Sequence, residues 1–96
     1  MSQAPRLFLI LDDEESIRQS IAAFMEDEGY RVFQAESTEE ALEIIRAHPI
    51  DDAVVDIRLP GQDGNSFMLE AIKIRPQIKF VVHMDVSMNY NQKINN

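Results

Sequence analysis

The sequence predicts an α/β fold in which a four-stranded parallel sheet lies between three helices. Four short, mostly apolar runs, at residues 7–11, 30–35, 53–56 and 79–83, alternate with segments whose apolar residues recur at helical spacing. The connections are short, and a strand that continues through a helix into another strand usually returns parallel to the first. We therefore expect a three-layer arrangement, with the sheet in the middle and helices on its faces.

The first strand and helix are indicated by residues 7–28. Residues 7–11 form an unbroken apolar run, which is typical of a strand buried on both faces. A helix is indicated after it by Ile17, Ile21, Phe24 and Met25, which recur at helical spacing. Gly29 follows, where a helix end favours the left-handed backbone conformation that glycine adopts easily. We expect the helix to run through Glu28.

A capping pattern marks the second helix. Residues 30–35 precede it and are rich in aromatic and β-branched residues, which favours a strand. Ser37 and Glu40 then have the spacing of a capping box, with Ser37 as the N-cap and Glu40 reaching back. The apolar face of the helix consists of Ala41, Leu42 and Ile45. The helix is expected to end before Pro49, because the residue preceding a proline disfavours helical geometry.

The second half of the chain repeats the alternation. Residues 53–55 lead a third strand into Asp56, and the Pro and Gly content of residues 59–64 indicates a loop. The third helix is indicated by Phe67, Met68, Ala71 and Ile72 and should stop near Arg75 and Pro76. Residues 79–83 read as the fourth strand.

Composition bounds the domain and its class. We expect one domain over residues 1–84 and an irregular polar tail over 85–96, where the apolar period is lost. The 9 basic and 17 acidic residues give a net charge of −8, which argues against direct nucleic-acid binding. There are no cysteines, and no apolar run is long enough to span a membrane. With no secretory signal visible, the expected location is the cytoplasm.

Acidic residues close two of the predicted strands. Asp12 and Asp13 follow the first strand, and Asp56 ends the third. If these strands are neighbours, the three carboxylates meet at one sheet edge, where open parallel sheets bind ligands. Each like-charge pair at about 4 Å costs about 4 kcal/mol at an effective dielectric constant near 20. Such a cluster needs a cation, and oxygen ligands without His or Cys favour Mg²⁺, with Mn²⁺ as the alternative.

A simpler interpretation of these acids stays open. Asp12 and Asp13 could cap the first helix, where acidic residues are favoured, and Asp56 could be an ordinary loop residue. The metal interpretation is favoured because acids occur at two matching strand ends and the loop at 59–64 follows. Because Mg²⁺ retains waters and recruits phosphate oxygens, the cluster points to phosphoryl chemistry.

Together these features resemble the receiver domains of two-component response regulators. The likeness rests on the acidic pair after the first strand, Asp56 after the third, a Leu-Pro pair at 59–60 and an Asp-Gly pair at 63–64. It covers about residues 7–84. The resemblance implies the flavodoxin-like receiver topology and a signalling phosphoacceptor, not an enzyme in the ordinary sense. It also implies a sensor histidine kinase or phosphotransfer protein as the partner.

The resemblance also assigns roles to residues. It implies that Asp56 is the phosphoacceptor, that Asp13 and Asp56 ligate Mg²⁺ directly, and that Asp12 acts mostly through water. The backbone carbonyl of Arg58 would be a further metal ligand. The loop after the acceptor would be shaped by Pro60 and Gly64.

The sequence departs from the family pattern after the fourth strand. Met84 occupies the position where receivers usually carry Thr or Ser, and the Lys expected at the end of a fifth strand is missing, since Lys93 lies in the polar tail. The last helix, strand and helix have no counterpart here. One alternative is therefore a receiver-like interaction module that does not switch on phosphorylation. A second consequence is that residues 79–83 become an apolar sheet edge, which favours self-association.

Two other functions fit the residues less well. A phosphohydrolase with Asp56 as nucleophile would need a general acid two positions later, where Arg58 cannot readily donate a proton. A flavodoxin-like cofactor binder would need a phosphate-binding loop after the first strand, where this chain has four acidic residues at 12–15.

Overall fold

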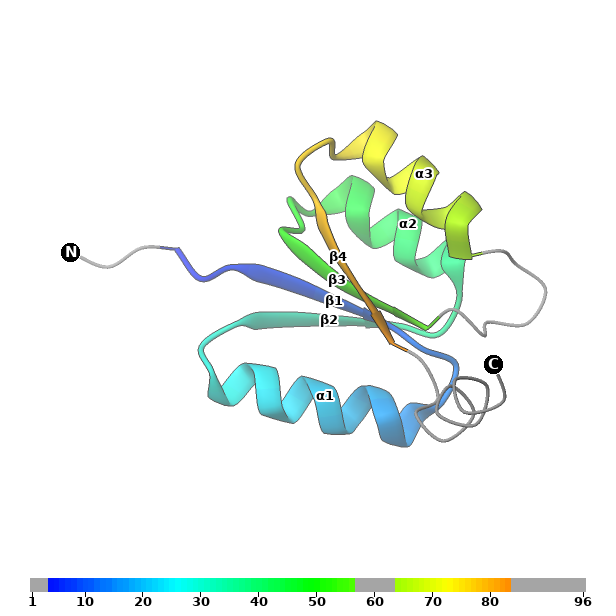
Figure 1. The fold of residues 1–96 in the computed structure, drawn as a ribbon. Helices are drawn as coiled ribbons and strands as arrows, with labels where there is room; N and C mark the ends of the chain where they lie inside the picture. The colour runs from blue at the N-terminus through cyan, green and yellow to red at the C-terminus, as the bar shows by residue number, and fades with distance from the viewer. Residues whose placement is uncertain (1–3, 57–63, 84–96) are drawn as a thin grey trace, which may run out of the picture.

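The computed structural model describes residues 4–56 and 64–83, which contain seven elements in the predicted alternation (Figure 1). The strands are β1 (Leu7–Leu11), β2 (Arg31–Ala35), β3 (Asp52–Asp56) and β4 (Lys79–His83), and the helices are α1 (Glu15–Asp27), α2 (Thr38–Ala47) and α3 (Gly64–Ile74). The predicted fold class is confirmed. The predictions for Arg58, Pro60, Met84 and the tail at 85–96 concern residues outside the described ranges.

All strands of the described sheet run parallel, in the order β2-β1-β3-β4. From β1 the chain first moves to one side, to β2, and then returns past β1 to β3 and β4 on the other side. The strand order therefore reverses between β1 and β3, which is where open α/β sheets bind ligands. The register pairs Leu11 with Val55, so the carboxyl ends of β1 and β3 finish level.

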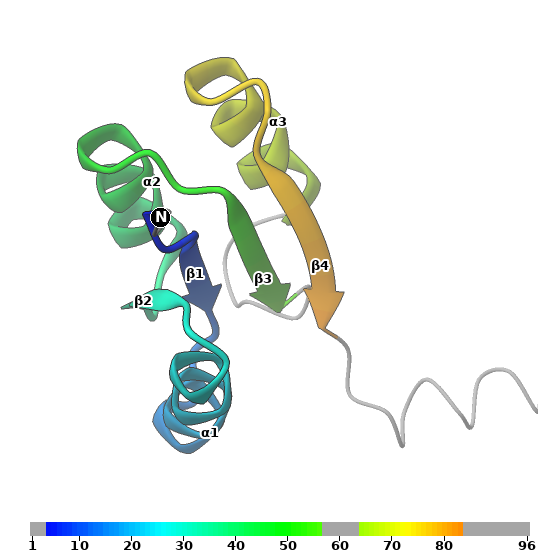
Figure 2. The same ribbon diagram turned by 90° about the vertical axis from the view of Figure 1, so that its left-hand side faces the viewer.

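Helices cover both faces of the sheet, which gives the expected three layers. Helix α1 lies on one face, and α2 and α3 lie on the other (Figures 1 and 2). Each face has its own core. The α1 side buries Phe8, Ile10, Ala22 and Val54, and the larger core on the other side includes Leu9, Leu11, Ile45, Val55, Phe67 and Ala71. Alternate residues of β1 thus serve both cores, as expected for a strand covered on both faces.

The helix ends follow the local sequence signals. Gly29 has a φ of 96° just after α1, a conformation that side chains with a Cβ rarely adopt. At α2, the Ser37 hydroxyl accepts a hydrogen bond from the Glu40 N–H at 3.2 Å. The Glu40 carboxylate reaches back to the N–H of Glu36 at 2.9 Å, one residue earlier than in the standard capping box. These contacts confirm the predicted start of α2.

The start of α3 differs from the sequence prediction. Gly64, which the sequence predicts to lie in the loop, is the first residue of the helix. Because glycine is a poor helix former and follows a Pro- and Gly-containing loop, the sequence pattern assigns Gly64 to the loop and not to the start of the helix. At its other end α3 is tied to α2, since the Arg75 guanidinium donates through Nε to the carbonyl of Ile45 at 3.1 Å. Within residues 4–56 and 64–83, none of the helices has both the length and the apolar character needed to cross a bilayer.

Candidate metal centre

Two strand ends bring the predicted acidic residues to one edge of the sheet. Asp12 directly follows β1, and its backbone N–H donates to the carbonyl of Ala35 at 3.1 Å, which fixes it beside the end of β2. Asp56 is the last residue of β3, one position beyond the pair formed by Leu11 and Val55. The register of β1 and β3 therefore places Asp12 and Asp56 level with each other, although 44 positions separate them in the sequence (56 − 12 = 44).

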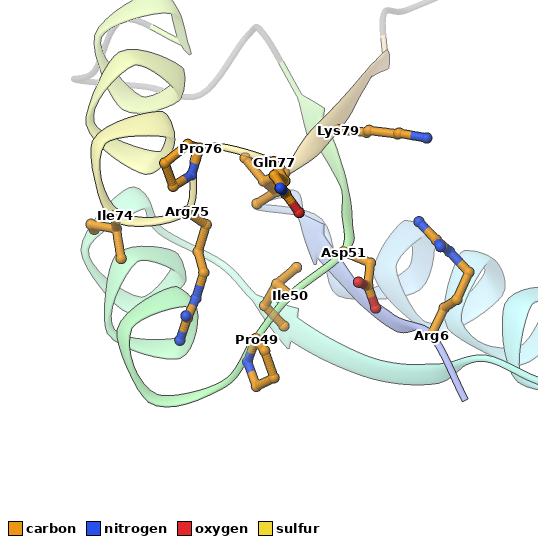
Figure 3. A pocket seen from close by; sticks show the side chains of 10 residues that line it. Arg6, Pro49, Ile50, Asp51, Ile74, Arg75, Pro76, Gln77 and Lys79 are labelled. Carbon is orange, nitrogen blue, oxygen red and sulfur yellow. The ribbon is translucent and has the colours of Figure 1, made fainter. Parts of the chain in front are cut away.

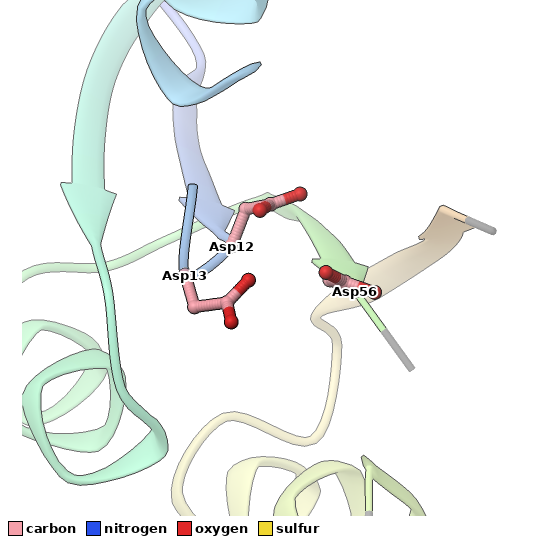
Figure 4. Close-up of side chains that lie close together, drawn as sticks. All are labelled: Asp12, Asp13 and Asp56. Atoms are coloured by element: carbon pink, nitrogen blue, oxygen red, sulfur yellow. The ribbon is translucent and has the colours of Figure 1, made fainter. Parts of the chain in front are cut away.

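The three carboxylates form a compact cluster. One oxygen from each of Asp12, Asp13 and Asp56 lies within 4.8 Å of the other two. Figure 4 shows the side chains directed toward a common space from the ends of β1 and β3. Asp12 and Asp56 are each only 1% exposed, whereas Asp13 is exposed. The cluster is thus buried on the sheet side and open to solvent beside Asp13.

The capping interpretation accounts for only part of this arrangement. The N-cap of α1 is Glu14, whose side chain makes no capping hydrogen bond. Asp12 instead orders the turn before the helix, because its Oδ1 accepts from the N–H of Glu14 at 2.9 Å. Neither role explains why Asp13 and Asp56 gather beside it, so the helix start alone does not explain the cluster.

One residue near the cluster was missed by the sequence analysis. Arg18 donates from Nη1 to the backbone carbonyl of Asp12 at 2.9 Å, and so ties α1 to the end of β1. The sequence could not predict this contact between residues six positions apart. It depends on the direction in which the turn between β1 and α1 points the backbone carbonyl of Asp12. Arg18 supports the backbone that carries Asp12 and Asp13.

Three clustered carboxylates favour the binding of a cation. At a separation of 4.8 Å, the buried pair Asp12 and Asp56 repels by about 3.5 kcal/mol at an effective dielectric constant near 20, and the two pairs with exposed Asp13 lie closer to the value of about 0.9 kcal/mol in bulk water. A hard divalent ion with metal–oxygen distances of about 2.1 Å spans about 4.2 Å between opposite ligands, close to the size of this gap. Three carboxylate oxygens are also the ligand type that such ions prefer over nitrogen or sulfur. The residues therefore fit a Mg²⁺-class ion.

Comparison with known proteins agrees with the fold. Residues 8–93 match the family described as the response regulator receiver domain. The response regulator GtcR of Aneurinibacillus migulanus is 42% identical over 59 residues, which cover 62% of this chain and 24% of that protein. This chain therefore spans only part of the length of that relative.

Solved receiver structures superpose on most of the chain. A receiver domain protein from Methanospirillum hungatei is 32% identical, with a TM-score of 0.80 over 84% of this chain and 65% of that one. A response regulator from Burkholderia pseudomallei is 29% identical, with a TM-score of 0.78 over 82% of this chain and 46% of that one. The Burkholderia structure holds a phosphorylated aspartic acid and a calcium ion. Given its sequence match, its sheet topology and its fold, this chain belongs to the response regulator receiver domain family of two-component signalling.

Proposed function

We propose that Asp56 accepts a phosphoryl group from a sensor histidine kinase or a phosphotransfer protein, with a divalent metal held beside it. The metal would be Mg²⁺, with Mn²⁺ as a substitute. Its direct protein ligands would be Asp13, Asp56 and the backbone carbonyl of Arg58, and Asp12 would act mostly through water. The observation that carries the proposal is the clustering of the three carboxylates within 4.8 Å at the strand-order reversal. Receiver domains as a family are signalling modules that work with such kinases, which gives the proposal its partner class.

The proposed reaction forms one bond and breaks one. A carboxylate oxygen of Asp56 attacks the phosphorus of a phosphohistidine, the P–N bond breaks, and the imidazole leaves with its electron pair. The bound metal would offset the negative charge on the transferring phosphoryl oxygens. The product is an aspartyl phosphate, which water later hydrolyses to reset the domain.

The chain's own residues support this role through burial and position. Asp56 is 1% exposed at the end of a central strand, so its carboxylate is held in one orientation. Asp13 lies on the open side of the cluster, which is the side from which a donor can approach. Asp12 is fixed through its backbone to β2 and through Oδ1 to the start of α1. This geometry supports Asp56 as the buried nucleophile, beside two further carboxylates that would hold the metal.

Labelling with acetyl phosphate tests the proposal on the full chain. In the presence of Mg²⁺, the intact mass should increase by one phosphoryl group, and chelation of the metal should abolish this gain. Asp56→Asn should remove the label while leaving the fold unchanged by circular dichroism. A matched control is Asp27→Asn, the same change at an exposed position at the end of α1, which should label normally.

The test also separates the alternative function. If Asp56 is labelled but labelling alters neither conformation nor association, the chain is a phosphoacceptor that does not switch. If the unmodified chain takes no label with either Mg²⁺ or Mn²⁺, an interaction module without phosphotransfer replaces the proposal.

A further inference from the structure

Asp12 is held through three of its polar groups. Its N–H donates to the carbonyl of Ala35 at 3.1 Å, and its Oδ1 accepts from the N–H of Glu14 at 2.9 Å. Its carbonyl oxygen accepts from Nη1 of Arg18 at 2.9 Å. The first two contacts come from backbone groups on either side of the cluster, whereas the third comes from a half-buried side chain on α1. The direction of the Asp12 carbonyl therefore depends on the side chain of Arg18.

The carbonyl that Arg18 holds belongs to the peptide bond between Asp12 and Asp13. A peptide bond is planar, so fixing the direction of its C=O also fixes its plane. Because the N–H of Asp12 is already tied to β2, that plane determines where the Cα atom of Asp13 lies. Asp13 has the one exposed carboxylate in the cluster, so packing contributes little to its position and the backbone has to supply it. Arg18 thus controls the backbone that carries this carboxylate.

We propose that Arg18 is a positioning residue for the metal centre, which keeps the Asp13 carboxylate within 4.8 Å of Asp56. This role rests on the proposed function, in which Asp13 and Asp56 ligate Mg²⁺ directly. Mg²⁺ demands near-ideal octahedral geometry, whereas Ca²⁺ accepts irregular coordination. A loosely held peptide between Asp12 and Asp13 should therefore weaken the binding of Mg²⁺ more than the binding of Ca²⁺.

Charge alone would give the opposite effect, which makes the two explanations separable. Residues 12–15 are all acidic, and Arg18 adds a cation beside them. Gln19, which donates to Glu15 at 2.9 Å, is neutral and does not offset these acids. Removing the guanidinium makes the surroundings more negative, so by Coulomb attraction it should tighten the binding of Mg²⁺ and Ca²⁺ alike. A weaker affinity after this change therefore indicates lost geometry.

A matched contact lies at the opposite end of the sheet. Arg75 is also half-buried, and it donates from Nε to the carbonyl of Ile45 at 3.1 Å, so it too joins a side chain to a backbone carbonyl of another element. It lines an open hollow of about 720 Å³ at the amino ends of the strands, together with Arg6, Asp51 and Lys79 (Figure 3). Arg75→Met therefore removes the same kind of hydrogen bond far from the acidic cluster.

Isothermal titration calorimetry of the full chain with MgCl₂ and with CaCl₂ tests the role of Arg18. Arg18→Met should raise the Mg²⁺ dissociation constant about tenfold, as expected when a group that orients a ligand is lost, and the Ca²⁺ constant by clearly less. Arg18→Lys keeps a cationic donor and should recover part of the Mg²⁺ affinity. Arg75→Met should leave both constants unchanged. Circular dichroism checks that each variant folds, and Arg18→Gln, whose amide is too short to reach the carbonyl, replaces Arg18→Met if that variant does not fold.

The possible failures point to different errors. A folded Arg18→Met protein that binds Mg²⁺ as tightly as the wild type, or more tightly, would overturn the role of Arg18 and leave the metal centre standing. Equal losses for Mg²⁺ and Ca²⁺ would overturn it as well, because lost geometry should distinguish the two ions. If the wild type binds neither ion, the metal centre itself is wrong, and the proposed function and the role of Arg18 fall together.

Discussion

Neutralising Asp13 should stabilise the protein when no divalent metal is present. Asp13 lies within 4.8 Å of both Asp12 and Asp56, so Asp13→Asn removes two like-charge pairs at once. Each pair is worth about 3.5 kcal/mol at an effective dielectric constant near 20, and about 0.9 kcal/mol in bulk water. Because Asp13 is exposed, its pairs lie close to the water limit, and about 1 kcal/mol per pair is the appropriate value. The free energy of unfolding should therefore rise by about 2 kcal/mol.

Urea unfolding followed by circular dichroism measures this change, once with EDTA and once with excess Mg²⁺. In EDTA the variant should be the more stable protein. In Mg²⁺ the advantage should shrink or reverse, because binding stabilises the wild type more than a variant that has lost a ligand. The control Asp27→Asn should shift stability by no more than about 0.5 kcal/mol, and equally in both conditions. If Asp13→Asn is no more stable than the wild type in EDTA, the carboxylates do not repel one another as the structure implies.

Two further predictions concern the elements that position the cluster. Ser37→Ala removes the hydroxyl that accepts from the N–H of Glu40, and should lower the free energy of unfolding by about 1 kcal/mol in urea titrations. Ser66→Ala, at an exposed helical position of α3, is the matched control and should not destabilise, since alanine is the better helix former. Gly29→Ala forces a Cβ onto a residue with a φ of 96° and should lower the thermal midpoint by several degrees, from a destabilisation of about 1 kcal/mol. An unchanged midpoint would show that the turn after α1 relaxes freely.

The fold could be predicted from sequence because local patterns and burial agree along most of the chain. The strand at Leu7–Leu11 is an unbroken apolar run because both of its faces are covered, and it was predicted with correct bounds. The second helix was predicted from its capping residues, which make the expected local hydrogen bonds. Such features depend only on neighbouring residues, so one sequence is enough to find them.

The site was harder to predict because it depends on the order of the strands. The meeting of Asp12 with Asp56 required β1 and β3 to be adjacent, which the alternation of elements alone does not determine. Likewise, the contact from Arg18 to the carbonyl of Asp12 depends on the path of one turn. The roles of Arg58, Pro60 and Met84 fall outside the described residues and stay predictions. The residue types and their positions at strand ends thus identified the acidic residues, whereas their proximity in space depends on the strand order of the folded sheet.

Binding of a paramagnetic ion shows where on the protein a divalent metal binds. Substoichiometric Mn²⁺ added to the ¹⁵N-labelled full chain broadens the amide signals of residues close to the bound ion. The signals of Asp12, Asp13 and Asp56 should broaden first, and excess Mg²⁺ should restore them. Preferential broadening at another acidic segment, such as the end of α1, or no selective broadening at all, would contradict a metal centre at the ends of β1 and β3.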